Sequence, residues 1–527
     1  MNTCDYLIVG AGSAGCVLAA RLSEDPHVRV LLIEAGGEDK RAEVRIPAAF
    51  NKLFKSECDW AYYTEPQRAL MDRNLYWPRG RMLGGTSSMN AMIYMRGHRA
   101  CYDHWRALGN DGWGYHDVLP YFRRAEHNER HASSEYHATG GPLWVSDLRC
   151  RNMLSECFID ACAQAGLPHN HDFNGHEQLG VGTYQVTQRN GERCSAADAY
   201  LKPALNRGNL QVWGDALVTH VLIERGRAIG IECATAGGRR IEQVRAEREV
   251  ILCGGAINSP QLLLLSGIGP ATHLRERGIA VVADLPGVGE NLQDHPVVPV
   301  TITCRTAVSL GGAETLANFL RYKLFRKGPL TSNVAEVGGF AQIRSDAPWP
   351  DLQFHFAPVY FVDHGFTKPT GHGFTIGVTL VGSRSRGTIR LRSKDPAEHP
   401  RIDPNYMSDA AEFEILREGI TMALGIADMH AFTKHVAKHY LPAHRPQSDK
   451  DLDIHLRQHA ETLYHPVGTC KMGPVSDAMA VVDPQLRVRG VEALRVVDAS
   501  IMPAIVNGNT NAPVIMIAEK AADLIRA

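Results

Sequence analysis

The stretch Tyr6-Leu7-Ile8-Val9-Gly10-Ala11-Gly12-Ser13-Ala14-Gly15 decides the fold, because an apolar run leads directly into the pattern G-x-G-x-x-G. Residues 6–9 predict a short buried strand, 14–23 a helix and 30–33 a second strand that ends at Glu34. Strand, glycine turn, helix and strand in this order form a βαβ unit of a parallel sheet. The N-terminus therefore predicts a Rossmann-like dinucleotide-binding domain.

Each glycine of this loop has its own physical role. Gly10 permits a tight turn, Gly12 lets the backbone approach a pyrophosphate, and Gly15 lets the helix pack closely on the strand. Ser13 and Ala14 open the helix, whose N-terminus attracts negative charge. We expect these residues to hold the diphosphate of a dinucleotide.

Two further features bear on which dinucleotide binds. Glu34 can accept hydrogen bonds from an adenosine ribose and would repel a 2′-phosphate, so NADP is disfavoured. A second loop at 80–92 contains the pair Gly84 and Gly85, followed by three hydroxyl residues. Its backbone N–H groups can bind a second part of a long ligand, as an extended FAD requires. The first loop alone does not distinguish NAD from FAD.

The remaining sequence predicts a discontinuous nucleotide domain and a second domain. A strand at 250–253 followed by the apolar helix QLLLLSG predicts a return to the parallel sheet. Between 300 and 400 the stretches TITC, LQFHFAPVYF, FTIGVTL and GTIRLRS predict a largely antiparallel sheet, and 409–460 predicts helices. We expect an α/β plus α+β fold. Its parts are an FAD-binding domain over 1–300 with embedded cap segments, a substrate-binding domain over 301–460, and a return over 461–527 that carries the catalytic residues.

Five ordered blocks resemble the glucose-methanol-choline (GMC) oxidoreductases. They are residues 80–103, 255–269, 464–470, 497–503 and 508–513. The resemblance spans essentially the whole chain and implies FAD as the cofactor. Together with the N-terminal loop and the paired glycines, the residues that it implies for FAD contact are Thr86, Asn90, Ala91, Val218, Asp498 and Ala499. We also expect Asn511 to contact the cofactor, since it shapes the loop near the flavin ring. Some members attach the flavin covalently through a histidine whose position here is Met89, so we expect non-covalent FAD.

The expected catalytic residues are His465 and Asn509. Oxidation of an alcohol requires loss of the hydroxyl proton and hydride transfer to flavin N5, and histidine is a suitable base near neutral pH. By resemblance, His465 occupies the position of the family's catalytic histidine. Asn509 stands where relatives carry histidine or asparagine and can donate a hydrogen bond to the alkoxide. His459, Glu336 and Tyr464 are possible neighbours to which we assign no catalytic role.

The blocks 464–470 and 508–513 look most like those of bacterial enzymes that oxidise aliphatic primary alcohols to aldehydes. The resemblance implies that electrons pass to a quinone or another acceptor. Choline remains the alternative substrate and oxygen the alternative acceptor, while an FAD-containing hydroxynitrile lyase is a distant alternative. Net redox turnover separates the lyase from the other enzymes.

Composition excludes several classes of protein. The net charge of -1 offers no excess of cations for a nucleic acid partner. The twelve cysteines form no C-x-x-C pair and the histidines no H-E-x-x-H motif, so we expect free thiols, a reducing compartment and no metal site. A strand begins almost at residue 1, and no run of 18 apolar residues occurs. We expect a cytoplasmic enzyme, with peripheral contact at the inner face of the membrane and the oligomeric state left open.

Overall fold

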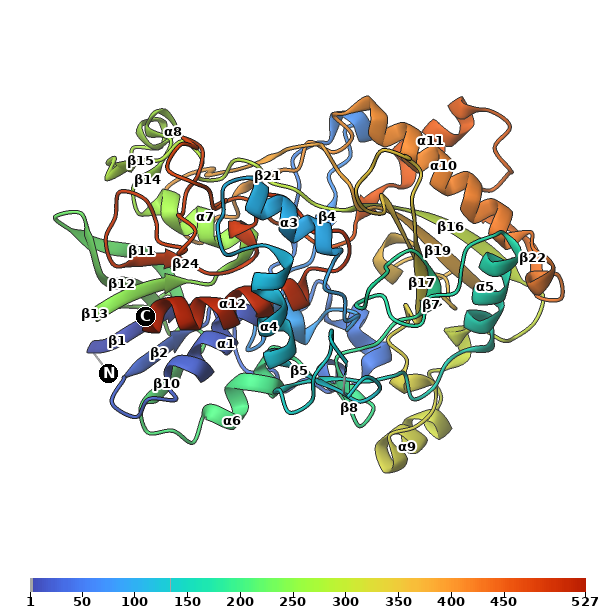
Figure 1. Cartoon of the computed structure of the whole chain (residues 1–527), viewed down its shortest axis with the longest axis horizontal. Helices are drawn as coiled ribbons and strands as arrows, with labels where there is room; N and C mark the ends of the chain where they lie inside the picture. Colours follow the sequence, from blue (N-terminus) through green and yellow to red (C-terminus); the bar gives the residue numbers. More distant parts are fainter. Residues whose placement is uncertain (1–2, 133) are drawn as a thin grey trace.

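The first of two large sheets builds the nucleotide domain in the computed structural model, which describes residues 3–132 and 134–527 (Figure 1). Its strand order is β10 (Leu210–Trp213), β2 (Val30–Ile33), β1 (Thr3–Val9), β13 (Arg240–Leu252), β12 (Arg227–Thr235) and β11 (Leu217–Glu224), and β24 (Leu494–Val496) pairs with the end of β13. The pairs β10–β2, β2–β1, β1–β13 and β13–β24 are parallel, whereas β12 and β11 add antiparallel pairs. All four residues of β2 are apolar and buried, as a parallel strand covered on both faces requires.

Helices from the two ends of the chain pack together on this domain. Helix α1 (Ser13–Leu22) packs against α12 (Asn511–Arg526), which also contacts α4 (Tyr115–Ala125). The fully buried carboxylate of Glu519 on α12 pairs with Arg21 at 2.8 Å and with Arg124 at 2.8 Å, so it joins all three helices. Both termini consequently lie on the same side of the molecule (Figure 1).

The second sheet, which we call the substrate sheet, is antiparallel throughout. Its order is β22 (Val436–Leu441), β16 (Pro296–Cys304), β19 (His372–Leu380), β18 (Leu352–Ala357), β17 (Val337–Ala341) and β7 (Gly180–Thr183), with β23 (Glu461–Thr462) paired to β16. Helices α5 (Met153–Gln164), α10 (Ala410–Ala427) and α11 (Asp449–His459) pack on it around a second apolar core.

Shorter elements connect and cover the two sheets. The helices are α2 (Ala42–Arg45), α3 (Arg99–Ala107), α6 (Lys202–Ala204), α7 (Gly255–Leu265), α8 (Ala271–Glu276) and α9 (Leu316–Phe325). The two-stranded ladders are β3 (Tyr62–Tyr63) with β4 (Tyr76–Trp77), β5 (Glu126–Asn128) with β6 (Leu143–Val145), β8 (Gln188–Arg189) with β9 (Glu192–Arg193), β14 (Ile268–Gly269) with β15 (Ala283–Asp284), and β20 (Thr388–Arg390) with β21 (Arg401–Asp403). Short 3-10 turns include η1 (Pro47–Leu53), η3 (Gly85–Ser88) and η6 (Pro329–Thr331).

The predicted fold class is confirmed, and two local expectations need correction. The stretch GTIRLRS forms β20, which pairs with β21 outside the substrate sheet, because the seven residues 381–387 separate it from β19 and lead the chain away from that sheet. The expected helical region 409–460 is interrupted by β22, which lies at the edge of the substrate sheet and contains no fully buried residue. The substrate sheet also includes β7 and β23, which lie outside 301–460.

Candidate active site

A single cavity of about 600 Å³ is lined by residues from both domains. Its wall combines the N-terminal glycine loop, the second glycine loop, strands β16, β18 and β19, and the C-terminal segment. The predicted site residues that line it are Gly10, Gly12, Ser13, Ala14, Glu34, Gly85, Thr86, Asn90, Ala91, Val218, His465, Asp498, Ala499, Asn509 and Asn511. Gly15 and Gly84 do not reach the cavity and shape the loops behind it. The tertiary structure therefore gathers residues separated by up to 501 positions, from Gly10 to Asn511.

The N-terminal loop needs glycine at three positions for three geometrical reasons. Gly10 has a φ of +100°, and a Cβ there would lie 2.6 Å from the carbonyl oxygen of Cys253. A Cβ on Gly15 would lie 1.9 Å from the carbonyl oxygen of Gly10, so only glycine lets α1 pack this close. No heavy atom lies within 4 Å of a Cβ added to Gly12. The space next to Gly12 is thus open for a ligand.

Glu34 is held by backbone donors at the end of β2. Its carboxylate oxygens accept hydrogen bonds from the N–H groups of Ala11 at 2.8 Å and Gly36 at 2.9 Å. Burial raises the pKa of Glu34 to about 7. Each oxygen retains a free lone pair that a ribose hydroxyl can use.

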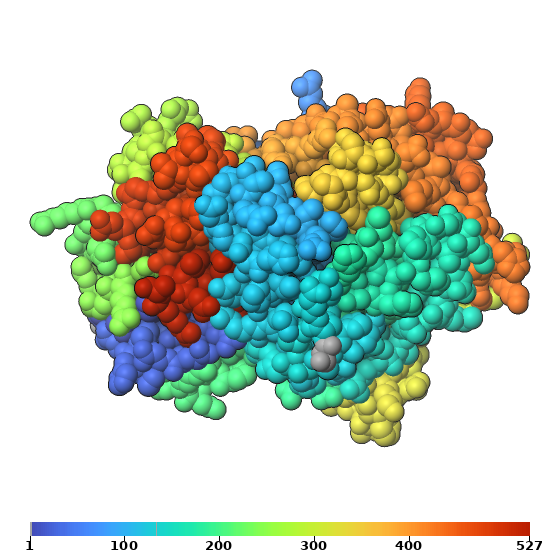
Figure 2. All heavy atoms as spheres, in the orientation of Figure 1, coloured from blue at the N-terminus to red at the C-terminus, as the bar shows by residue number. Residues whose placement is uncertain are grey.

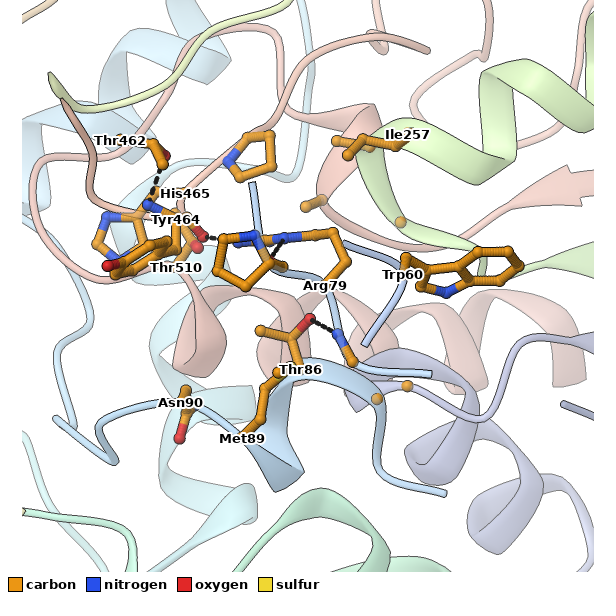
Figure 3. A pocket seen from close by; sticks show the side chains of 18 of the residues that line it. Trp60, Arg79, Thr86, Met89, Asn90, Ile257, Thr462, Tyr464, His465 and Thr510 are labelled. Atoms are coloured by element: carbon orange, nitrogen blue, oxygen red, sulfur yellow. Dashed lines mark hydrogen bonds between the residues drawn. The ribbon is translucent and has the colours of Figure 1, made fainter. Parts of the chain in front are cut away.

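The two glycine loops contact each other. The N–H of Gly84 donates to the carbonyl oxygen of Ala11 at 2.7 Å, and a Cβ on Gly85 would lie 2.8 Å from the Cα of Gly12. The hydroxyl of Thr86 accepts a hydrogen bond from the N–H of Gly80 at 3.1 Å (Figure 3). The second loop therefore forms the opposite wall of the same cradle.

C-terminal residues complete this cradle. The buried carboxylate of Asp498 accepts hydrogen bonds from the N–H of Gly255 at 2.8 Å and the hydroxyl of Ser259 at 2.6 Å, which ties the segment after β24 to the start of α7. The hydroxyl of Ser13 donates to Asn511 Oδ1 at 2.7 Å, which joins the N-termini of α1 and α12. These contacts place two helix N-termini at one end of the cavity.

The expected catalytic pair also lines the cavity. His465 Nε2 is 3.3 Å from Asn509 Nδ2, and His465 is 8% exposed. Burial, followed by the nearby His295, His355 and Arg79, lowers the pKa of His465 well below its usual value. The ring is therefore neutral at pH 7 and able to accept a proton.

His295 is a site residue that sequence reasoning missed. Its Nδ1 lies 3.0 Å from the Nδ1 of His465, so one of these two atoms must carry a proton. Asn509 Oδ1 accepts from Gln353 Nε2 at 3.3 Å, which turns the Asn509 amide nitrogen, a donor, toward His465 Nε2. This network assigns an unprotonated Nε2 to His465 and an Nδ1–H that donates to His295. The basic nitrogen thus faces the cavity.

Asp294 and Arg79, also missed, fix the loop that carries His465. Asp294 accepts hydrogen bonds from the backbone N–H of His465 at 2.7 Å and from the hydroxyl of Thr462 at 2.6 Å. Arg79 donates to the carbonyl oxygen of Tyr464 at 2.5 Å, as Figure 3 shows. The motif Asp294-His295-Pro296, at the start of β16, is the feature of the sequence that could have identified Asp294 and His295 as site residues.

Strand β18 brings Gln353 and His355 to the cavity side of the substrate sheet. Burial lowers the pKa of His355 to about 3, and its Nε2 has no hydrogen-bond partner among the described residues. The alternation of Leu352, Phe354 and Phe356 with these two polar residues was the signal that could have found them. His355 thus lines the cavity and has a buried ring nitrogen without a hydrogen-bond partner in the part of the chain that the structure describes.

The three side chains without an assigned role have different positions. Tyr464 and His459 line the cavity. Glu336 lies behind it, where its carboxylate accepts hydrogen bonds from the hydroxyls of Ser155 and Ser332, both at 2.6 Å. No cluster of His, Cys, Asp and Glu able to hold a metal ion occurs in residues 3–132 and 134–527.

Comparison with known proteins gives a consistent result. Family models described as GMC oxidoreductase match residues 4–297 and 383–518. The chain is 46% identical to the alcohol dehydrogenase [acceptor] of Pseudomonas putida over 99% of this chain and 95% of that protein. It is 46% identical to human mitochondrial choline dehydrogenase over 99% of this chain and 89% of that protein. The crystal structure of pyridoxine 4-oxidase from Mesorbium loti covers 99% of this chain and is itself covered to 98%, with a TM-score of 0.89 at 33% identity.

Proposed function

This chain belongs to the GMC oxidoreductase family, and we propose that it oxidises a primary alcohol to an aldehyde and passes the electrons to a quinone or another acceptor. The observation that carries the proposal is the neutral His465 ring, whose basic Nε2 faces the cavity beside the Asn509 amide. The relative from Pseudomonas putida, named as an alcohol dehydrogenase that uses an acceptor, supports the same reaction.

The cofactor is FAD, and the cradle fits it. Gly12 and Gly255 both face space with no heavy atom within 4 Å of an added Cβ, as close approach of a diphosphate requires. Glu34 offers acceptors for the ribose, and the second loop extends the binding surface toward His465. Met89 lines the cavity with a thioether in place of a nucleophilic ring nitrogen, which supports non-covalent binding. When bound, FAD supplies the flavin that accepts the hydride of the alcohol.

The chain's own residues handle the proton and the alkoxide. His465 Nε2 accepts the hydroxyl proton, while the Asn509 amide N–H donates to the substrate oxygen as negative charge develops. The imidazolium that forms lies beside the alkoxide, whose charge offsets the burial that otherwise disfavours a protonated His465. Asp294 holds the backbone of His465, and the contact of its ring with His295 Nδ1 orients the base.

One part of the cavity wall favours a substrate with an apolar body. It includes Val297, Val334, Ala357 and Phe361. Such a surface binds an alkyl or aryl chain by burying it, and it makes no demand for a charged headgroup. Oxidation of a neutral primary alcohol is the function that this wall supports best.

Choline is the second candidate because one carboxylate is available to a cation. Asp363 lines the cavity, is exposed and forms no ion pair with any residue that the structure describes. Phe54 and Phe361 line the same cavity and could contact a trimethylammonium group. Glu461 also lines the cavity, but it already pairs with Arg73 at 3.2 Å and is therefore less available to a substrate cation.

Anaerobic flavin reduction across a panel of 1-alkanols, benzyl alcohol and choline tests the proposal. We expect neutral alcohols to reduce the flavin. Asp363→Asn is expected to leave this reaction unchanged, whereas it would lower kcat/KM for choline about tenfold if choline binds there. Reduction by choline alone would overturn the first proposal in favour of the second. Rapid reoxidation by oxygen but not by a quinone analogue would identify an oxidase instead.

We also propose a cytoplasmic location. All twelve cysteines are free, which supports a reducing compartment.

A further inference from the structure

Helix α9 carries a cluster of apolar side chains that the rest of the protein leaves uncovered. Leu316, Phe319, Leu320, Leu324 and Phe325 are between 44% and 74% exposed. The helix projects from the body at the lower right of Figure 1, and it appears in Figure 2 as the yellow protrusion at the lower edge. Single exposed apolar residues are ordinary, but five on one short helix indicate a binding surface. We call these five side chains the α9 apolar cluster.

The helix is oriented by its other face. Tyr322 is 2% exposed, and its hydroxyl donates to the carbonyl oxygen of Arg45 at 3.0 Å. Leu316, Leu320 and Leu324 follow at intervals of four residues, so they share the face that points away from this anchor. The fold therefore presents the apolar face outward.

The charged residues of α9 and of the segment just after it are all positive. Residues 316–328 contain no Asp or Glu, and they contain Arg321, Lys323, Arg326 and Lys327. Arg326 pairs with Glu192 at 3.0 Å, whereas the other three cations form no ion pair with any residue that the structure describes. Exposed apolar side chains bordered by free cations are the pattern that binds a bilayer with anionic headgroups.

We propose that α9 docks this enzyme on the surface of an anionic membrane. The α9 apolar cluster enters the boundary between headgroups and acyl chains, and the cations bind the lipid phosphates. No helix in the described residues is long and apolar enough to cross a bilayer, so the contact lies at the surface. This inference is independent of which alcohol the enzyme oxidises.

The position of α9 links the membrane contact to the active site. Glu314, just before the helix, pairs with Lys52 of η1 at 2.9 Å, and η6, just after it, packs against η1. Phe50 of η1 lines the catalytic cavity. A bilayer bound at α9 would therefore be connected to the cavity wall through η1 and would hold the enzyme where apolar alcohols and membrane acceptors dissolve.

Vesicle flotation with the purified holoenzyme tests the proposal. We expect the enzyme to float with vesicles of phosphatidylglycerol and phosphatidylethanolamine and to bind vesicles of phosphatidylcholine much more weakly. Leu320→Ser with Leu324→Ser should weaken partition about 10- to 100-fold. Lys323→Ala with Lys327→Ala should weaken it about 30-fold on anionic vesicles only. Neither pair should change flavin reduction by a soluble alcohol.

Ile454→Ser on α11 is the matched control, because Ile454 is also helical and is 40% exposed. It should float as the unmodified enzyme does. Absence of flotation with anionic vesicles, or equal flotation of the Leu320 and Leu324 variant, would overturn the proposal. A dimer in sedimentation that the same variant dissociates would overturn it too, because the α9 apolar cluster would then cover a second copy of the chain.

Discussion

Replacement of His295 by alanine tests whether this residue sets the protonation state of the catalytic base. The side chain does not line the cavity, and its contact with His465 is the 3.0 Å distance between the two Nδ1 atoms. Without it, the Nδ1–H of His465 is buried with no acceptor, which costs about 1–3 kcal/mol. The alternative tautomer, with its proton on Nε2, is then favoured and cannot act as the base.

This penalty corresponds to a fall in kcat of about 5- to 150-fold, with little change in KM for the alcohol. The pH profile should change as well. The reaction needs neutral His465, so the rate falls as pH drops through the pKa of that group. Burial is the largest cause of its low pKa, and His295 is the next, so its removal moves the acidic limb of the profile toward higher pH.

Stopped-flow flavin reduction over a range of pH measures both effects. His295→Asn should recover much of the rate, because the amide oxygen occupies nearly the place of Nδ1 and can accept from His465. His273→Ala is the matched control: His273 is a buried histidine that accepts one hydrogen bond, from the N–H of Leu391 at 3.1 Å, away from the cavity. It should lower Tm without changing kcat. An unchanged kcat and an unshifted acidic limb in His295→Ala would refute the assigned tautomer.

Four further variants test the cradle and the base. His465→Ala should keep FAD bound, seen by its absorbance, but slow flavin reduction by alcohol about 10²- to 10⁴-fold; reduction at an undiminished rate would exclude His465 as the base. Gly15→Ala should lower the Tm of the apoprotein, since its Cβ would lie 1.9 Å from the carbonyl oxygen of Gly10, whereas Gly12→Ala should keep that Tm and weaken FAD binding in a titration; equal effects of the two would contradict the separate roles. Glu34 has a folded pKa of about 7 against 4.5 for the ordinary group, so its contribution to apoprotein stability is present below pH 4.5 and is lost, by about 3 kcal/mol, as pH rises to 7. Glu34→Gln should remove this loss when the free energy of unfolding of the apoprotein is measured with urea between pH 4.5 and 7. The same pH dependence in the variant and the unmodified protein would show that Glu34 is not responsible.

The cradle for the cofactor was predictable because its requirements are local. A strand, a turn with Gly10 and Gly12, and a helix N-terminus lie within ten residues of each other, and each imposes a residue type on its own backbone. His465 and Asn509 were predicted from ordered sequence blocks that resemble a known family. They lie in loops whose residues are set by chemistry rather than by packing.

The tertiary structure alone decided what surrounds the base. His295 reaches His465 from 170 residues away, and Gln353 reaches Asn509 from 156 residues away. No periodicity in the sequence predicts such contacts between different elements. The exposure of the α9 face could not be predicted from the sequence either. An apolar stripe on a helix predicts burial, and only the fold shows that this face is left uncovered. Local backbone geometry and residue chemistry are thus readable from the sequence. The proton position on His465 and the free surface of α9 depend on which distant segments pack together.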